Sequence, residues 1–415
     1  MKTRGNDPRQ IYITIINFNS KNRDKQMKKR VLIQSILSGF LAIALPMSAQ
    51  AATEALKHPL WYKAPSAKTM ELAKISDLSN TVVSDGQRGE KGVLASTLKI
   101  TPEQAAKIKA GKFTVAISMG WLGDDWATEQ LIGLKETFAK LGIKVVAETN
   151  ADWDDARQIS DLEAISVLKP SLLISIPLNS QTTASAYKKI RAAGTKIVFI
   201  DQAVDGMNPG KDYASIISSD NLALGMYVAD LLAESVGGKG DVGALFFAND
   251  FYVTNLRYEG FVARLAAKYP QIKLVAVAGH DNPNKGQEVS QALLARYPNM
   301  KGLYGSWSVP AMGAVVAANV AGKSPTNFKI VCENFDQIVA GNVAKNGFIA
   351  GISSQRPYDQ GVAEATVGAL TLIDVATPPY VVVPPLAVKR TNLPASYKTI
   401  YRTELPTQMA ADLKK

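Results

Sequence analysis

The sequence has very little of the residue types that most catalytic and metal sites require. Its 415 residues include two histidines, His58 and His280, and one cysteine, Cys332. This scarcity excludes a histidine-rich metal site and argues against a Ser-His-Asp or Cys-His triad. Neither a Walker phosphate loop nor a G-x-S-x-G nucleophile elbow occurs. We therefore expect no enzyme activity, no catalytic residue, no metal and no cofactor.

The lone cysteine cannot form an internal disulfide, and its apolar, strand-like surroundings predict a buried structural thiol. A basic surface that could bind nucleic acid is also lacking. The formal net charge is +11, but residues 1–51 hold nine basic and two acidic residues, which leaves only +4 on residues 52–415. Those remaining charges are not clustered, and no basic recognition helix occurs, so we expect no nucleic-acid partner.

The basic excess at the N-terminus belongs to a pattern typical of an exported protein. The cluster Lys28–Arg30 precedes a short apolar run, 31–45, and small residues at 49 and 51 form an A-x-A cleavage site. The run is too short to cross a bilayer comfortably. We predict a signal peptide cleaved near Ala51 and a periplasmic mature protein. The sequence leaves open whether translation starts at Met1 or at Met27.

Beyond residue 51 a polar extension is followed by a long alternating segment. Residues 101–104 read Thr-Pro-Glu-Gln, a capping box with proline at the first helical position, which predicts a short helix ending near Gly111. From Phe113 onward, apolar runs alternate with amphipathic stretches. The expected strands are 113–119, 144–148, 171–176, 196–200, 241–247, 273–278, 302–305, 329–332 and 349–353, and the expected helices are 129–141, 155–169, 180–193, 222–235, 256–268, 286–296, 310–321 and 358–375.

This alternation predicts an α/β fold with parallel sheets that carry helices on both faces. The rhythm runs twice at similar length, so we expect two doubly wound parallel-sheet lobes joined by a hinge. Ligands of such sheets bind at the carboxyl ends of the strands, which predicts a cleft between the lobes. The expected organisation is a leader and signal peptide in 1–51, an N-terminal extension in 52–111, a first lobe in 112–219 plus 356–381, and a second lobe with a C-terminal tail in 220–355 plus 382–415.

Polar and aromatic side chains gather just after the expected strands. Aromatic faces beside carboxylates and an arginine suit a polyhydroxylated small molecule, because the hydroxyls form charge-assisted hydrogen bonds while the C–H faces stack on indole rings. The predicted ligand-binding residues are Trp121, Asp124, Trp126, Asp201, Gln202, Ser219, Asn249, Arg257, Trp307, Asn334, Asp336 and Gln355.

At these positions the sequence resembles the periplasmic sugar-binding proteins of the ribose-binding type, which are type 1 periplasmic binding proteins and substrate-binding components of ABC transporters. The resemblance covers roughly residues 113–377. It rests on the order and spacing of Asp124-Asp125-Trp126, the stretch 179–201, Ser219-Asp220-Asn221, Arg257-Tyr258-Glu259-Gly260-Phe261, Gly313-Ala314 and Gln355-Arg356-Pro357-Tyr358.

The resemblance implies roles for several residues. Asp124 stands where the family has a hydrogen-bonding asparagine, and Trp126 stands where it has a stacking aromatic. Asp201 and Arg257 match the residues that hold sugar hydroxyls from the first and second lobes, and Gln355 matches a glutamine at the hinge crossing.

The chain also departs from the family pattern. Ile176, Gln202 and the pair Trp307-Ser308 replace polar or charged residues, which puts ribose itself in doubt and favours a different sugar, a polyol or a modified small ligand. The sequence leaves open whether Asn334 or Asp336 matches the family's second-lobe aspartate.

Some of these residues also have structural alternatives. Asp125 and Asp220 are expected to cap helices. Arg257 could pair with Glu259 or Asp250 at the surface, although its place after a strand favours the cleft. A further expectation is that His280 and Asp281 form a solvated pair in a loop.

We therefore predict an exported, monomeric solute-binding protein. It captures a small sugar or polyol between its lobes and delivers it to an ABC transporter permease in the inner membrane. The alternative is a ligand-sensing receptor module that feeds a membrane signalling partner, with residues 52–111 available for that partner.

Overall fold

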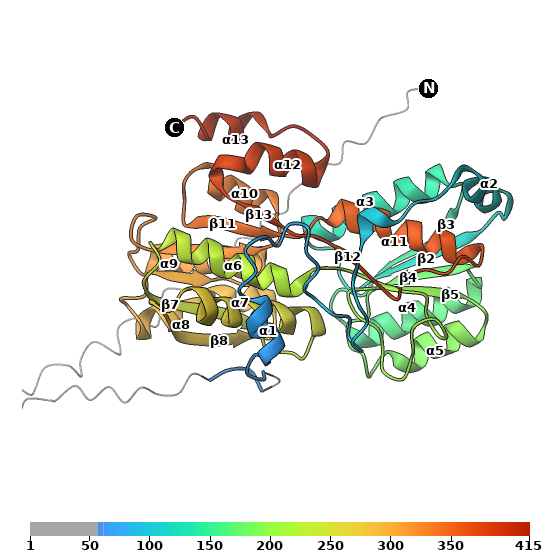
Figure 1. Cartoon of the computed structure of the whole chain (residues 1–415), viewed down its shortest axis with the longest axis horizontal. Coiled ribbons are helices and arrows are strands. Elements are labelled where there is room, and N and C mark those ends of the chain that lie inside the picture. The colour runs from blue at the N-terminus through green and yellow to red at the C-terminus, as the bar shows by residue number, and fades with distance from the viewer. Residues whose placement is uncertain (1–56, 61) are drawn as a thin grey trace, which may run out of the picture. The chain divides into compact units, whose positions relative to one another are not determined.

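The computed structural model describes residues 57–60 and 62–415, so the predicted leader and signal peptide lie outside the described residues. Two sheets form the framework of these residues (Figure 1). One has seven strands in the order β1-β12-β6-β5-β4-β2-β3, and the other has six in the order β13-β11-β10-β9-β7-β8. The six-stranded sheet has one antiparallel pair, between β11 and β13, and its other pairs are parallel. The predicted α/β fold with two lobes of parallel sheet is confirmed.

The first lobe is built on the seven-stranded sheet. Alternate residues of one strand point to opposite faces. On β2, Val115 and Ile117 pack with α3 and α11, while Ala116 packs with α4 and α5. The strands are β1 (Val93–Leu94), β2 (Thr114–Met119), β3 (Lys144–Asn150), β4 (Leu172–Ser175), β5 (Lys196–Ile200), β6 (Ile216–Ser219) and β12 (Tyr380–Val383), and the helices are α2 (Pro102–Ala110), α3 (Asp125–Lys140), α4 (Asp155–Leu168), α5 (Ala184–Ala192) and α11 (Pro357–Leu372).

The second lobe repeats this layering around the six-stranded sheet. Helices α6 and α7 cover one face, and α8, α9, α10 and α12 pack on the other, where the predicted burial of Cys332 is confirmed. The strands are β7 (Gly240–Phe247), β8 (Ile272–His280), β9 (Gly302–Tyr304), β10 (Lys329–Glu333), β11 (Ile349–Ser354) and β13 (Leu386–Val388), and the helices are α6 (Asn221–Ser235), α7 (Tyr252–Lys268), α8 (Gly286–Arg296), α9 (Ser308–Val320), α10 (Gln337–Ala344), α12 (Leu393–Tyr401) and α13 (Thr407–Asp412).

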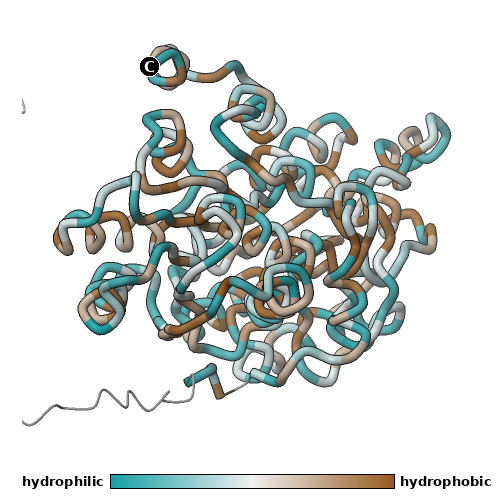
Figure 2. Tube along the Cα trace, turned by 60° about the vertical axis from the view of Figure 1, so that its left-hand side comes forward, coloured by the Kyte–Doolittle hydropathy of each residue, from teal (hydrophilic) through white to brown (hydrophobic). Residues whose placement is uncertain are grey.

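Outer helices of both lobes carry apolar and hydrophilic residues in alternation, as expected for helices that bury one side (Figure 2). Among residues 57–60 and 62–415, no helix has both the length and the apolar character that crossing a membrane requires.

Two helices begin four residues earlier than the sequence predicts. Helix α3 starts at Asp125 and α7 starts at Tyr252, whereas the expected starts were residues 129 and 256. The first turn of α3 forms because the side chain of Asp124 accepts a hydrogen bond from the backbone N–H of Ala127. The short elements β6, β12, β13, α10, α12 and α13 were not predicted.

Glycines bring one pair of helices into backbone contact in each lobe. A Cβ atom at Gly361 of α11 would lie 2.1 Å from the carbonyl oxygen of Gln130 on α3. In the second lobe, a Cβ at Gly225 of α6 would lie 1.8 Å from the carbonyl oxygen of Arg257 on α7. Only glycine permits this approach, which fixes the place of α7 and therefore of the arginine it carries.

The N-terminal extension folds against both lobes. Helix α1 (Ala67–Leu72) precedes β1, which pairs with β12 at the edge of the first sheet. The predicted capping box is confirmed, since Thr101 accepts from the backbone N–H of Gln104 and Gln104 accepts from the backbone N–H of Thr101. The lobe boundaries proposed from the sequence stay a prediction.

Candidate functional site

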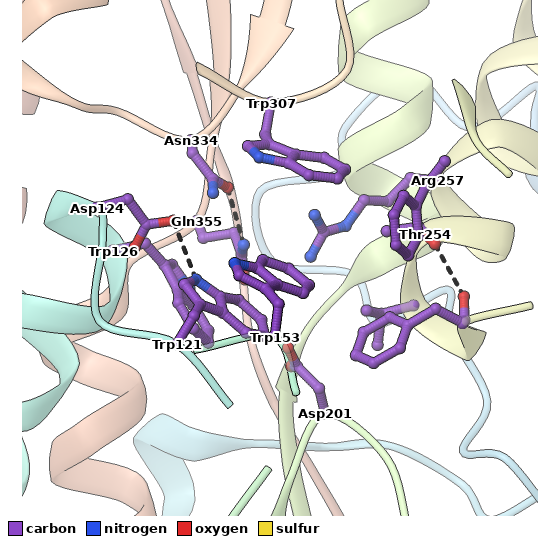
Figure 3. Close-up of a pocket in the computed structure, with 13 residues that line it drawn as sticks. Trp121, Asp124, Trp126, Trp153, Asp201, Thr254, Arg257, Trp307, Asn334 and Gln355 are labelled. Carbon is purple, nitrogen blue, oxygen red and sulfur yellow. Dashed lines mark hydrogen bonds between the residues drawn. The ribbon is translucent and has the colours of Figure 1, made fainter. Parts of the chain in front are cut away.

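A cavity lies where the carboxyl ends of the two sheets face each other (Figure 3). The space between its lining residues, including the part open to solvent, is about 440 Å³. Residues that follow strand ends reach it from both lobes, among them Asp201 after β5 and Asn334 after β10. The structure therefore brings these residues together at the place that the fold predicts.

Aromatic rings form much of the cavity wall. Trp121 stacks on Trp153 with ring centroids 4.3 Å apart and on Trp126 at 5.3 Å, so three indoles form one stack. Trp307 lies on the other side of the cavity and contacts the ring of Phe247, with centroids 5.5 Å apart (Figure 3). Four of the chain's five tryptophans thus line this one cavity.

Asp124 holds the indole stack in place. One carboxylate oxygen caps α3, and the other accepts a hydrogen bond from Nε1 of Trp121 at 3.1 Å. Burial raises the pKa of Asp124, while the two N–H donors act in the opposite direction. Both of its oxygens are engaged within the protein. The side chain that the sequence singles out as a ligand contact therefore also positions Trp121.

Asp201 and Arg257 approach the cavity from opposite lobes. Asp201 is 3% exposed, and one of its oxygens accepts a hydrogen bond from the hydroxyl of Ser218 at 2.7 Å. Burial raises the pKa of Asp201, and the nearby guanidinium of Arg257 opposes that rise. Nε of Arg257 donates to Asn221 at 2.8 Å and Nη1 donates to Glu333 at 2.9 Å.

The guanidinium of Arg257 points into the cavity (Figure 3). It forms an ion pair with Glu333, a buried residue at the end of β10. The sequence had left Glu259 or Asp250 at the surface as possible partners. A buried ion pair of this kind orients the arginine, because moving either charge would leave the other one unpaired.

Two buried polar atoms beside the cavity have no hydrogen-bond partner within the described chain: Nε1 of Trp126 and Oε1 of Gln355. The amide of Gln355 is oriented by its other end, since Nε2 donates to Oδ1 of Asn334 at 2.9 Å. Buried polar groups in native proteins are nearly always paired. One free donor and one free acceptor therefore indicate where a polar ligand can bind.

Four non-glycine residues with left-handed backbone cluster around the cavity. Trp153, Asp201, Ser306 and Asn334 have φ between 56° and 64°, and each closely follows a strand. A residue in this conformation costs about 1–3 kcal/mol, and such strain gathers at binding sites because it aims side chains that regular structure cannot aim.

Two predicted contacts, Gln202 and Ser219, are buried away from the cavity. The side chain of Gln202 donates to the carbonyl of Pro177 at 3.0 Å, and its Oε1 accepts from the backbone N–H of Tyr252 at 3.3 Å. The hydroxyl of Ser219 contacts Oε1 of Gln360 on α11 at 3.3 Å. Both side chains connect protein segments to each other and do not line the cavity.

The other two, Asn249 and Asp336, also lie outside the cavity wall. Asn249 follows β7 and lines an outer groove that shares Trp153, Phe247 and Phe251 with the cavity. Asp336 accepts a hydrogen bond from Ser308 beneath the cavity. Of the two candidates for the second-lobe position, Asn334 lines the cavity and Asp336 does not.

Sequence reasoning missed five lining residues. Phe247 ends a predicted strand, and the rule that residues at the carboxyl ends of strands face the cleft could have found it. Trp153 has no such signal, because it lies three residues beyond β3. Phe251, Val253 and Thr254 were missed because the sequence predicts the start of α7 at residue 256.

The expectation that His280 lies in a solvated pair was wrong. His280 ends β8 and is 1% exposed, with Nε2 3.1 Å from the hydroxyl of Ser306 and its ring 5.0 Å from Trp307. Burial lowers its pKa to about 4, so the imidazole is neutral at pH 7. His280 supports Trp307 from behind, and Asp281 alone is solvated, in an ion pair with Lys285.

Known proteins share this architecture. The model of a periplasmic binding protein domain matches residues 115–371. The chain is 26% identical to the ribose import binding protein of Bacillus subtilis over 55% of this chain and 74% of that protein, and 26% identical to the D-apiose import binding protein of Actinobacillus succinogenes over 57% and 74%. A crystal structure of an ABC transporter solute-binding protein from Agrobacterium vitis, bound with α-D-tagatopyranose, is similar with a TM-score of 0.64 and 23% identity, covering 71% of this chain and 100% of that one.

Proposed function

The chain belongs to the periplasmic binding protein domain family, as a type 1 periplasmic sugar-binding protein of the ribose type, and from this premise we propose that it captures a small sugar or polyol between its two lobes. The observation that carries the proposal is the cavity between the carboxyl ends of the two sheets, which combines stacked indoles with unpaired polar groups. Indole faces suit the C–H faces of a sugar ring.

The polar groups of the cavity include both hydrogen-bond acceptors and hydrogen-bond donors. Asp201 and Gln355 offer acceptor oxygens, while Arg257 and Trp126 offer N–H donors. A hydroxyl group donates and accepts at once, so a ring of hydroxyls fits such a set better than a purely acidic or purely basic ligand does. The curated relatives are named for ribose and apiose import, which supports a sugar of similar size.

Six aromatic side chains in the wall favour a ligand with more apolar surface than ribose. Trp307, which stands where the family pattern has a polar residue, also favours such a ligand. We therefore favour a hexose, a deoxy sugar, a polyol or a modified sugar as the ligand.

The wider proposal is that the protein is exported to the periplasm, acts as a monomer and delivers its ligand to an ABC transporter permease without converting it. The relatives' names support import as the process. The sensing alternative rested on residues 52–111 as a free partner surface. The described part of that segment packs on α6, α7 and β12 of its own chain, which favours transport over sensing.

A thermal-shift screen of the mature protein against pentoses, hexoses, deoxy sugars and polyols tests the proposal. A ligand that binds the native state raises the melting temperature by mass action. We expect at least one sugar or polyol to do so, and Asp201→Asn to weaken its binding at least tenfold, because a hydrogen bond to a charged group contributes about 1.5–3 kcal/mol. Asparagine tolerates the left-handed backbone of this position.

The control is Asp205→Asn, which changes an exposed aspartate of the same loop and should keep full stabilisation by the ligand. If no sugar or polyol raised the melting temperature, the proposed function would be wrong. Unchanged affinity of Asp201→Asn would instead overturn the assignment of the site.

A further inference from the structure

Residues 83–88 of the N-terminal extension lie at the junction of the two lobes, and we call this segment the strap. In Figure 1 the N-terminal segment runs from α1, beside α7, toward β12 of the first lobe. The strap is contributed by the part of the chain that has no counterpart in the family match, which begins at residue 115.

The strap closes a ring of hydrogen bonds that joins both lobes. From the first lobe, the backbone N–H of Ala203 donates to Oε1 of Gln87 at 3.0 Å. From the second lobe, the hydroxyl of Tyr252 donates to the carbonyl oxygen of Asp85 at 2.8 Å. The ring is completed directly between the lobes, because the backbone N–H of Tyr252 donates to Oε1 of Gln202 at 3.3 Å.

Two members of this ring, Gln202 and Tyr252, are direct chain neighbours of residues that line the ligand cavity. Gln202 follows Asp201, which lines the cavity from the first lobe. Tyr252 stands between Phe251 and Val253, which line it from the second lobe. A change in the distance between the two sides of the ring therefore moves residues that line the cavity.

Side-chain hydrogen bonds hold the strap at both ends. Its start is fixed by the carboxylate of Asp220, which accepts hydrogen bonds from the backbone of Val83 at 2.6 Å and from both the backbone and the hydroxyl of Ser84. Its end is fixed by Arg88, which donates to the hydroxyl of Tyr213 at 2.9 Å and to the carbonyl of Val204 at 3.1 Å.

A tight turn shapes the segment between these anchors. The backbone N–H of Gly86 donates to the carbonyl of Glu90 at 2.8 Å, and the backbone N–H of Gly89 donates to the carbonyl of Gly86 at 2.9 Å. The turn presents Asp85 and Gln87 to opposite lobes. The anchor at Asp220 lies where the chain passes from β6 of the first lobe to α6 of the second.

We propose that the strap is a positioning element of the ligand site, which ties the two lobes together and favours the closed arrangement around the cavity. The inference rests on the proposed function. Separating the lobes breaks at least one bond of the ring, so the strap lowers the free energy of the closed form relative to an open one. A ligand that requires the closed form then binds more tightly, because less of its binding energy is used to close the lobes.

Distances between spin labels on the two lobes test the proposal without a ligand. Labels on Glu163→Cys of α4 and Lys273→Cys of β8, both exposed positions, report the separation of the lobes, and the buried Cys332 does not react. We expect Gln87→Ala to shift the distance distribution of the unliganded protein toward longer and broader values. Tyr252→Phe, which removes only the hydroxyl, should act in the same direction, so the test does not depend on one variant's folding.

Lys91→Ala is the matched control, because Lys91 is an exposed residue of the same turn and its ion pair with Asp85 stays within the extension. It should leave the distances unchanged. With the sugar found by the thermal-shift screen, Gln87→Ala should also raise Kd about 3- to 10-fold, the range expected for one intramolecular hydrogen bond. The melting temperature of the unliganded protein should stay close to that of the wild type.

The outcomes separate the two proposals. If the distances in Gln87→Ala and Tyr252→Phe matched those of the wild type, the strap would have no positioning role, whatever the protein binds. If no sugar bound to the wild type while the distances still shifted, the proposed function would fail and the strap would stand.

Discussion

Single side chains in and beside the cavity wall also support their neighbours. Asp124 caps α3 and orients Trp121, and His280 packs behind Trp307. The consequence is that residues outside the cavity wall can be as important to binding as those that line it. Asp336 is such a residue, since it lies buried between Ser308 and the first turn of α3.

The pH dependence of the free energy of unfolding should reveal the protonation of Asp336. Burial raises its pKa to about 7, whereas an aspartate in the unfolded chain has a pKa of about 4. The folded state therefore binds the proton more tightly, and this residue's contribution to stability falls as the pH rises from about 4 to about 7. Above pH 7 the full cost of the buried charge is present.

Asp336→Asn removes that cost while keeping an acceptor for Ser308. The stability of the variant relative to the wild type should therefore increase by about 1–3 kcal/mol between pH 5 and pH 8. Urea unfolding at both pH values measures this difference. A constant difference would show that Asp336 does not titrate in this window.

At the scale of helices, close packing sets the positions of side chains that line the cavity. Arg257 reaches the cavity from α7, and α7 rests on α6 through Gly225 and Gly260. The same device appears in the first lobe at Gly133 and Gly361 between α3 and α11. In both lobes, one helix of the pair carries a residue that lines the cavity.

Gly225→Ala should separate α6 from α7, because its Cβ would lie 1.8 Å from the carbonyl oxygen of Arg257. Overpacking of this kind costs about 1–3 kcal/mol. We expect a lower melting temperature together with weaker sugar binding, because the arginine moves with its helix. The control is Gly341→Ala in α10, where the nearest atom is 3.8 Å away and the fold should be unaffected or slightly stabilised. Equal melting temperatures for the two variants would contradict this account of the helix contact.

Two helix caps should differ in their contribution to stability. Asp154 is exposed and caps α4 alone, accepting from the backbone of Ala156 and Arg157. Asp220 is buried and caps α6 while also holding the start of the strap. Asp154→Ala should cost about 1 kcal/mol. Asp220→Ala should cost at least about 3 kcal/mol, because it also leaves buried donors unpaired. Similar losses in denaturant unfolding would mean that the strap contributes nothing to stability at this point.

At the scale of the whole molecule, Asp125 makes a connection between the lobes that does not involve the strap. Oδ2 of Asp125, in the first turn of α3, accepts from the backbone N–H of Gln337 at 2.8 Å and from the hydroxyl of Tyr401 at 2.6 Å. Both donors belong to the second lobe. The expectation that Asp125 caps the helix was wrong: Asp124 is the N-cap of α3, and the carboxylate of Asp125 bonds to the second lobe.

Tyr401→Phe should weaken this bridge while keeping the ring. We expect Kd for the bound sugar to rise about 3- to 10-fold, because one hydrogen bond of the closed form is lost. Tyr397→Phe is the control. Tyr397 lies on the same helix as Tyr401, and both rings pack against Phe335. Isothermal titration of both variants measures the effect, and equal affinities would show that the bridge does not support closure.

Local patterns in the sequence were sufficient for the class of fold and for much of the site. Alternating apolar runs predict the strands and helices, and a residue after a parallel strand must lie at the carboxyl edge of the sheet. Asp201, Asn334 and Gln355 were found in this way. The leader stays a prediction from the sequence, because its basic, apolar and small-residue segments are contiguous but lie outside the described residues.

Only the tertiary structure showed which polar groups, far apart in the sequence, form hydrogen bonds with each other. Gln202 has the position of a ligand contact in the sequence, but its amide binds Pro177 and the backbone of Tyr252. Nothing near Gln87 in the sequence indicates that it receives the N–H of Ala203. Secondary structure follows from the local periodicity of side chains, whereas the partner of a buried polar group is determined by which segments packing brings within 3 Å of it. The sequence by itself therefore determined a two-lobed binding protein, and the packing of the extension determined how its lobes are tied together.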